Sequence, residues 1–285
     1  MNILSIQSSV VFGHVGNSAA VFTLQRLGHE AWPIDTVQFS NHTGYGSWSG
    51  QVFGAEHLTD LVDGIDQRGI LGHCDAVLSG YLGEAAIGRV ILDAVSRVRS
   101  VNGKALFCCD PVMGDAGRGL FVRPDIPSFF AEHALPAADL ITPNQFELEL
   151  LNGGPITGLK DAIAAARRLQ ARGPSLVAVT SLQAPAVPSG RLGSLLVSPA
   201  GAWLVDTPLL PFDRPPAGAG DVFAAFLLGR LLAGTRPPEA LERTVNGVYH
   251  LLADSLAERS AELMLAVAQE KLVQPPRLHS VRQVG

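Results

Sequence analysis

Two short apolar runs enclose a helical pattern in residues 76–110, which read AVLSGYLGEAAIGRVILDAVSRVRSVNGKALFCCD. The runs at 76–80 and 105–110 have the length and apolar content of buried strands, whereas residues 84–99 have the period of an amphipathic helix. A strand, a helix and a second strand in this order are typical of a βαβ unit. The stretch therefore predicts an α/β protein built around a parallel sheet.

The same alternation extends through most of the chain. It predicts further strands at 3–7, 31–36, 139–142 and 176–180, a hairpin at 194–198 and 202–205, and helices at 17–27, 57–68, 159–172, 219–233, 238–253 and 257–271. No linker stands out by composition, so we expect a single domain over residues 1–285. The residues from Gln274 onward, with two consecutive prolines, are expected to form a surface extension.

The composition favours a large buried core and argues against two classes of partner. Of the 285 residues, 47% are hydrophobic and 16% are charged, which suits a globular chain. The formal charge of −5 argues against nucleic acid, because binding to phosphate backbones requires a basic surface. The most apolar helical segment, 222–228, meets Arg230 long before a membrane span would be complete, so we expect no membrane partner.

Cysteine usage and the N-terminal residues indicate a reduced, cytoplasmic setting. The three cysteines are too few for a disulfide framework, and the adjacent Cys108 and Cys109 should face opposite sides of one strand. Residues 1–8 carry neither a basic lead nor a sustained apolar run, so they do not resemble a signal peptide. We therefore expect a cytoplasmic protein.

A glycine-rich turn, Gly218-Ala219-Gly220-Asp221, opens the helix predicted at 219–233. Glycines at a helix start let the backbone approach an anion, and the free amide groups and the helix dipole stabilise its charge. Asp221 could take a proton from a substrate hydroxyl while these amides hold the phosphoryl group that the hydroxyl attacks. The same residues also suit an ordinary helix cap, so the turn alone leaves both interpretations open.

Further acidic and amide side chains follow two predicted strands. Asn144 and Glu147 are three residues apart, so on a helix they share a face and could address one hydrated cation. Magnesium suits such a pair because it prefers oxygen ligands and keeps several waters. A capping arrangement, in which Glu147 reaches back to the helix start, explains the pair equally well. Asp110 ends another strand and precedes a glycine-rich loop that could cover a triphosphate.

Polar residues near the N-terminus could receive a small heteroaromatic substrate. Ser8 is expected at the end of the first strand, and residues 13–17 and 40–45 add glycines, hydroxyl groups and a tyrosine. Competing motifs are missing from the sequence: there is no P-loop, no HExxH zinc motif, and the GxxxG at 46–50 has Trp48 where a nucleophile elbow needs serine.

Taken together, these blocks resemble a known enzyme family. Residues 218–221 resemble the signature of the ribokinase superfamily, and residues 144–147 resemble its NxxE magnesium motif. Within that superfamily the chain is similar to the pyridoxal kinases. The blocks that carry this likeness are Ile6 to Ser8, Gly13 to Ala19, Thr36 to Thr43, Ser79 to Gly83 and Asp110 to Gly114. Thr180 departs from the bacterial members, which often carry a lysine at this position.

The resemblance implies a fold, a reaction and a set of site residues. The fold is a ribokinase-like three-layer α/β/α sandwich with a central, mainly parallel sheet, assembled as a homodimer. The reaction transfers the γ-phosphate of ATP to the 5′-hydroxyl of pyridoxal with Mg²⁺ as cofactor, and the need for a monovalent cation stays open. Asp221 would be the base, and Gly218, Ala219 and Gly220 the anion hole. Ser8, Thr43, Gly44, Tyr81 and Asp221 would bind the vitamin. Asp110, Thr142, Asn144, Glu147, Thr180, Ser181, Thr207, Pro208 and Leu209 would bind ATP, with Glu147 and Asp110 also at the metal.

Two other functions remain open from the sequence. One is a related small-molecule kinase that acts on hydroxymethylpyrimidine or a sugar. The other is a non-catalytic vitamin B6 binding protein, against which the presence of both Asp221 and Glu147 argues.

Overall fold

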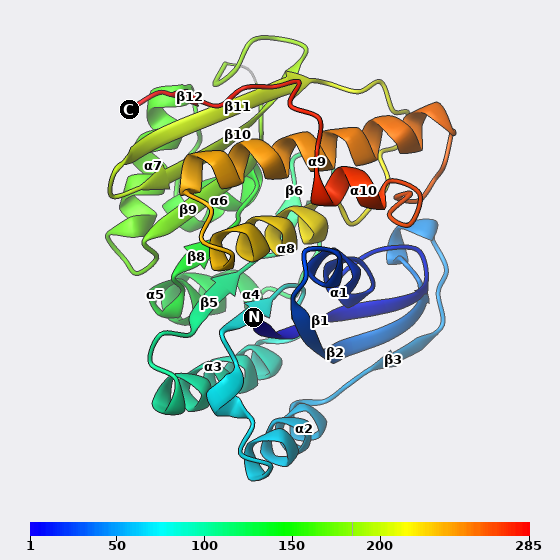
Figure 1. Cartoon of the computed structure of the whole chain (residues 1–285), viewed down its shortest axis with the longest axis vertical. Coiled ribbons are helices and arrows are strands. Elements are labelled where there is room, and N and C mark those ends of the chain that lie inside the picture. The colour runs from blue at the N-terminus through cyan, green and yellow to red at the C-terminus, as the bar shows by residue number, and fades with distance from the viewer. Residues whose placement is uncertain (184) are drawn as a thin grey trace.

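The computed structural model describes residues 1–183 and 185–285 and contains a ten-stranded central sheet (Figure 1). Its strand order is β12-β11-β10-β9-β8-β5-β4-β1-β2-β3. The bounds are β1 (Asn2–Phe12), β2 (Glu30–Asn41), β3 (Gly50–Val52), β4 (Ala76–Ser79), β5 (Leu106–Cys109), β8 (Leu140–Ile141), β9 (Leu176–Leu182), β10 (Arg191–Ser198), β11 (Gly201–Pro208) and β12 (Arg282–Gln283). The pairs from β9 across to β2 are parallel and the outer pairs are antiparallel. The predicted mainly parallel sheet is confirmed.

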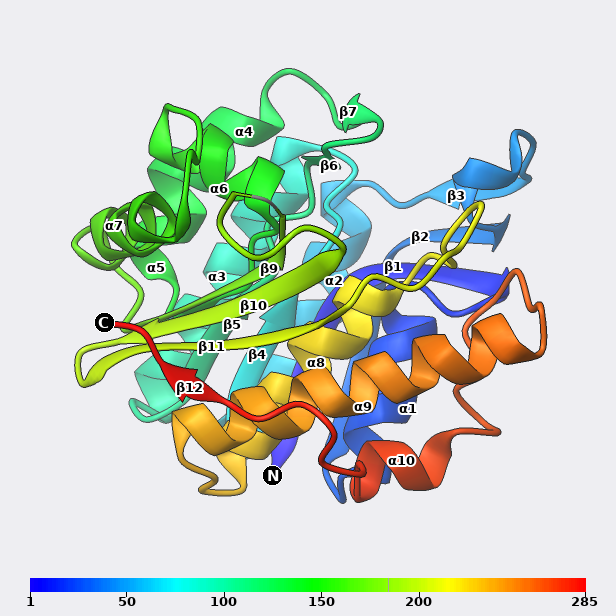
Figure 2. The ribbon, with the colours of Figure 1, turned by 90° about the horizontal axis from the view of Figure 1, so that it is seen from above.

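Helices cover both faces of the sheet and form the outer layers of the sandwich (Figure 2). One face carries α2 (Ala55–Gln67), α3 (Ala85–Val101), α4 (Ile126–Phe129), α5 (Leu135–Ala137), α6 (Gln145–Asn152) and α7 (Leu159–Gln170), and the other carries α1 (Asn17–Arg26), α8 (Ala219–Leu232) and α9 (Pro237–Ala257). Cys109 packs in the hydrophobic core between the sheet and helices α2 to α7, and Cys108 packs in the core on the opposite face, with α1, α8 and α9. Successive side chains of a strand point to opposite faces, so this arrangement is expected.

Helix α8 is apolar on nearly every side because it is covered on nearly every side. Phe223 and Leu227 face the sheet, whereas Val222 and Phe226 pack against a third cluster that includes Leu251 of α9. An all-round apolar helix is expected in such a buried position. Across residues 1–183 and 185–285, the structure offers no helix with the length and hydropathy needed to cross a bilayer.

The predicted helix at 257–271 is wrong. Helix α9 ends at Ala257, residues 258–268 are irregular, and only the short α10 (Gln269–Val273) follows. Arg259 has a positive φ of 51°, and the amides of Arg259 and Ser260 donate to the carbonyls of Leu256 and Ser255. These two hydrogen bonds form a Schellman motif, which stops a helix at that point.

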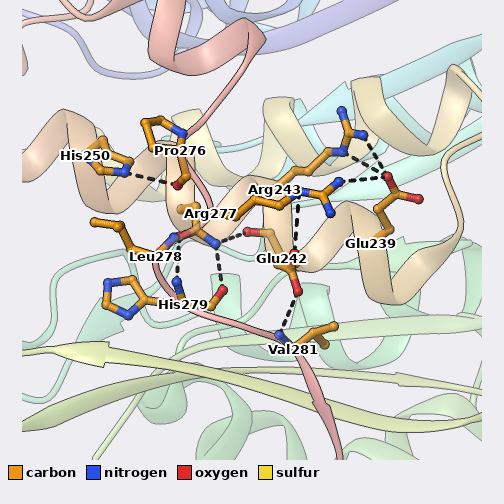
Figure 3. A network of polar contacts seen from close by, with 10 residues as sticks. Glu239, Glu242, Arg243, His250, Pro276, Arg277, Leu278, His279 and Val281 are labelled. Carbon is orange, nitrogen blue, oxygen red and sulfur yellow. Dashed lines mark hydrogen bonds and ion pairs between the residues drawn. The ribbon is translucent and has the colours of Figure 1, made fainter.

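The C-terminal segment from Gln274 onward lies largely exposed on the surface, as predicted, and specific contacts hold it there. It crosses α9 and ends in β12, which pairs with β11 and covers that edge of the sheet (Figure 2). Figure 3 shows the polar contacts that tie Pro276, Arg277 and Val281 of this segment to α9. The buried side chain of Asn246 binds this segment: its Oδ1 accepts from the amides of Leu278 and His279, and its Nδ2 donates to the carbonyl of His279. Glu242 accepts from the Val281 amide at 2.8 Å. Since β12 pairs the outer strand, the segment protects an edge that would otherwise be open to other chains.

Two elements near the strand ends differ from the prediction. Strand β1 continues to Phe12, so Ser8 lies inside it at a register shift against β2 rather than at its end. A small antiparallel pair, β6 (Gly114–Asp115) and β7 (Gly119–Leu120), forms from the glycine-rich loop after β5.

Candidate active site

A cavity of about 360 Å³ lies at the carboxyl-terminal ends of the parallel strands, where α/β sheets bind ligands. Twelve of the predicted site residues line it: Ser8, Thr43, Gly44, Tyr81, Asp110, Thr142, Asn144, Glu147, Thr180, Gly218, Gly220 and Asp221. Residues separated by more than two hundred positions in the sequence thus meet in one space.

Five predicted residues do not line this cavity. Ala219 is the first residue of α8, beside two glycines that do line it. Ser181 belongs to β9 and has a positive φ of 57°. Thr207 and Pro208 end β11, and Leu209 follows with 56% of its surface exposed. The segment 207–209 therefore lies outside the cavity, and its place beside an adenosine group stays a prediction.

The start of α8 depends on a glycine at one position. Gly218 has a φ of +96°, and a Cβ on it would lie 1.7 Å from the carbonyl oxygen of His14. Only glycine fits such a contact and adopts that backbone without strain. At Gly220 a Cβ would meet nothing within 4 Å, so the backbone is open on the cavity side. The first amides of α8 are therefore free to face an anion.

The Asp221 carboxyl group lies in the first turn of α8. Burial raises its pKa to about 6, and hydrogen bonds from the backbone of Gly16 and of Asp221 itself oppose that rise. A carboxylate with such a pKa is ionised at neutral pH and still basic enough to receive a proton.

On the opposite side of the cavity, Glu147 and Asn144 form a capping box at the start of α6. The Asn144 side chain accepts from the Glu147 amide at 3.0 Å, and the Glu147 carboxylate accepts from the Asn144 amide at 2.9 Å. Glu147 also accepts from the Met113 amide at 2.8 Å, which ties α6 to the segment after β5. The capping interpretation is confirmed, and it does not remove the pair from the cavity.

The buried carboxyl group of Asp110 lies close to that of Glu147. Burial and the charges of Glu147 and Asp221 raise the pKa of Asp110 well above its usual value, and its Oδ1 accepts from the Thr142 hydroxyl at 2.8 Å. Burial raises the pKa of Glu147 to about 7. Nearby positive charge would reverse both shifts, so the site suits a divalent cation. In the described ranges no set of three acidic, histidine or cysteine side chains could hold an ion alone. Two carboxylates with waters and phosphate oxygens are the ligands that Mg²⁺ usually takes.

The other half of the cavity is apolar and suits a flat ring. Val10, Val15, Val37 and Phe39 line it together with Tyr81, whose pKa is raised by burial. Mostly apolar walls with a few polar groups are usual for small-molecule sites.

Several other residues that line the cavity were not predicted individually from the sequence, and of these His42, Asp115 and Arg118 are polar. The Nδ1 of His42 accepts from the Gly44 amide at 3.2 Å, which leaves Nε2 as the donor nitrogen, and burial lowers the pKa of this imidazole. Arg118 pairs with Asp115 in the β6–β7 hairpin. The sequence indicated the regions that contain two of them: His42 lies in one of the blocks that resemble the kinase family, and Arg118 lies in the glycine-rich loop after Asp110.

Comparison with known proteins finds similar sequences over the full length of the chain. Residues 70–263 match the model of the phosphomethylpyrimidine kinase family. The chain is 55% identical to pyridoxal kinase PdxY of Rubrobacter xylanophilus over 100% of this chain and 98% of that protein. It is 48% identical to pyridoxal kinase PdxY of Deinococcus radiodurans, over 99% and 96% of the two chains.

A solved structure has the same fold over the whole chain. Pyridoxal kinase of Leishmania donovani, in complex with ADP and ginkgotoxin, superposes with a TM-score of 0.90 at 30% identity, covering 100% of this chain and 99% of that one. The same kinase with ADP and pyridoxamine superposes with a TM-score of 0.89.

Proposed function

The chain belongs to the pyridoxal kinase family of ATP-dependent phosphotransferases, and we propose that within it Asp221 is the base that activates the 5′-hydroxyl of pyridoxal. The observation that carries this role is the position of the Asp221 carboxyl group, which lies in the first turn of α8 beside the free amides of residues 218–220. One cavity thus combines a proton acceptor, an anion-binding helix start and an apolar wall for the ring.

The chemistry follows from the charge that develops during phosphoryl transfer. The moving phosphoryl group carries negative charge on its oxygens, so positioning and electrostatic stabilisation dominate over covalent help. The amides at the start of α8 stabilise that charge, and Asp221 receives the hydroxyl proton as the oxygen bonds to phosphorus. Ser8, Thr43, Gly44 and Tyr81 hold the vitamin ring in this proposal.

For the nucleotide side we propose that Asp110 and Glu147 face Mg²⁺, with Thr142 and Asn144 as supporting groups. Mg²⁺, when bound, supplies positive charge to the phosphates. Burial raises the pKa values of both carboxyl groups, and the charge of Glu147 raises that of Asp110 further, which supports this assignment. Thr180, Ser181 and residues 207–209 are proposed on the adenosine side. Comparison of turnover in potassium and in sodium salts tests for a monovalent cation.

Replacement of Asp221 by asparagine tests the assignment of the base. Asp221→Asn keeps the shape of the side chain and loses the proton acceptor, so turnover should fall about 10²- to 10⁴-fold. ATP binding should stay close to that of the unmodified protein. Product is measured as the absorbance of pyridoxal 5′-phosphate, and Asp213→Asn, at an exposed position outside the cavity, is the matched control. Near-normal turnover of Asp221→Asn would remove Asp221 from this role.

Hydroxymethylpyrimidine is the second substrate to test, because the matching family model is described as a phosphomethylpyrimidine kinase. The curated relatives at 46–55% identity are pyridoxal kinases, so we expect pyridoxal to be the preferred substrate. Parallel assays with the two substrates measure the ratio of their kcat/KM values.

We also propose that the chain forms a homodimer in the cytoplasm, each copy being one domain over residues 1–285. Val11, Phe12, Trp48 and Val52 are exposed apolar side chains near the outer ends of β1, β2 and β3, and an apolar surface of this kind suits a partner. The three cysteines are buried and free, which fits a reducing compartment. Light scattering of the purified protein tests the dimer.

A further inference from the structure

The irregular segment after α9 is tied closely to the active site. Its residues 260–265 lie where a helix was predicted, and serine side chains fix their course. The Ser255 hydroxyl accepts from the Met264 amide at 3.1 Å, and the Ser260 hydroxyl accepts from the Glu262 amide at 3.1 Å. Leu263 is fully buried, with its side chain 3.2 Å from where a Cβ of Gly218 would lie. The segment therefore rests against the anion-binding turn.

Glu262 extends from this anchored segment and contacts two other turns of the site. Its Oε2 accepts from the His14 amide at 3.2 Å, and its Oε1 accepts from the Tyr45 hydroxyl at 2.5 Å. Gly13 makes room for it, because a Cβ there would lie 2.4 Å from Oε2. The carboxylate thus joins the turn at 13–16 to the turn at 42–46.

The turn at 42–46 needs such support. Thr43 and Gly44 line the cavity, yet the turn is a short 3₁₀ helix with no buried residue. Its other hydrogen bonds lie within the turn or to its neighbours. Within the described part of the chain, two hydrogen bonds link it to distant segments: the one from Tyr45 to Glu262, and one from the Arg214 guanidinium to the Gly44 carbonyl. The ring of Phe12, 6.2 Å from that of Tyr45, adds an apolar contact.

We propose that Glu262 is a positioning residue that holds Tyr45, and with it Thr43 and Gly44, against the pyridoxal side of the cavity. The inference rests on the proposed function. The carboxylate does not line the cavity, so in this proposal it acts through the tyrosine. Its loss therefore weakens pyridoxal binding and leaves the ATP side, which is built from other elements, unchanged.

A double-mutant cycle on Tyr45 and Glu262 tests the proposal. Tyr45→Phe should raise the KM for pyridoxal roughly five-fold, since it removes one hydrogen bond to a charged group at a half-exposed position. Glu262→Ala should raise this KM at least as much. The double variant should be no worse than Glu262→Ala, since both changes break the same contact. The KM for ATP and kcat should stay within about two-fold in all three.

Controls and a second readout separate this role from general damage. Tyr249→Phe and Glu258→Ala change the same residue types outside the contact and should behave like the unmodified protein. Glu262→Gln keeps an oxygen acceptor, so its KM should fall between those of the unmodified protein and Glu262→Ala. The hydrogen bond to Glu262 raises the pKa of Tyr45, so a spectrophotometric titration of Glu262→Ala should show one tyrosine that ionises at lower pH.

An unchanged pyridoxal KM in Tyr45→Phe would overturn the proposal, as would additive effects in the double variant or a fall in kcat at constant KM. Tyr45→Phe decides the matter alone if Glu262→Ala does not fold. If the unmodified protein forms no pyridoxal 5′-phosphate, the proposed function fails instead. The pyridoxal Kd from calorimetry then replaces KM in the same cycle.

Discussion

At the residue scale, burial gives the carboxyl group of Asp221 a pKa that suits its proposed role as a base. The surrounding protein raises its pKa, and backbone donors including Gly16 limit the rise to about 6. The sequence predicted that this aspartate and a glycine turn belong together. It did not predict Glu262, because the contact of its carboxylate with the His14 amide joins segments far apart in the chain.

The pH dependence of the reaction should report this carboxyl group. A base has to be ionised, so kcat/KM for pyridoxal should rise with pH through about 6 and level off above about 7. The measurement is kcat/KM from pH 5 to 9 at saturating Mg²⁺ and ATP. A profile that stays flat below pH 6 would contradict the assignment.

Gly218 and Gly220 should respond differently to the same added methyl group. Gly218→Ala places a Cβ against the His14 carbonyl in a left-handed backbone, so the free energy of unfolding should drop by about 2 kcal/mol or more. Gly220→Ala meets no atom within 4 Å and should unfold at nearly the same urea concentration as the unmodified protein. Equal urea midpoints for the two variants would contradict this prediction, because they would mean that the backbone near His14 moves to accept the Cβ at position 218 without loss of stability.

At the scale of elements, the strongly periodic segments were predicted well and the irregular ones were not. The parallel strands and the helices α1, α2, α3, α7 and α8 occur close to their predicted positions. The helix predicted at 257–271 does not form there, because Arg259 takes the left-handed position of a Schellman motif, for which glycine is the usual sequence signal. Strand β12 was missed because two residues carry no periodicity.

Replacement of Arg259 by glycine should stabilise the protein. The backbone of Arg259 has a φ of 51°. This conformation is strained for a residue with a Cβ atom and is not strained for glycine. We expect a gain of about 0.5–1 kcal/mol in the free energy of unfolding, with unchanged turnover. Urea denaturation measures the gain, and Arg236→Gly, at a cap with a negative φ, serves as a control in which no gain is expected. A less stable Arg259→Gly would mean that the arginine side chain contributes more than the strain costs.

At the scale of the whole molecule, the ionised carboxyl groups of the active site lower the stability of the folded protein. Asp110, Glu147 and Asp221 have raised pKa values, so the folded state favours their protonated forms. Between about pH 4 and pH 7 the folded protein keeps protons that the unfolded chain has lost. Stability contributed by these groups is therefore present at low pH and declines as pH rises through this window.

Asp221→Asn should thus be more stable than the unmodified protein at pH 8, although its turnover should be far lower. The advantage should shrink towards pH 4, where the aspartate is protonated in the folded state and about half protonated in the unfolded chain. Urea midpoints at pH 4.5, 6 and 8 measure the trend, and Asp213→Asn, on the surface, should show none. A constant difference across this pH range would mean that packing rather than ionisation sets the effect.

The contact between Gly218 and the His14 carbonyl also decides how the chain can be divided. The vitamin side of the site comes largely from residues before 82, and the anion-binding turn comes from residues after 216. A break in the exposed stretch 123–125 would leave neither fragment with a working site, and only reassociation would bring His14 and Gly218 together again. Two such fragments could each be fused to one of a pair of interacting proteins. Binding of that pair would then restore the kinase, and the absorbance of pyridoxal 5′-phosphate would measure it.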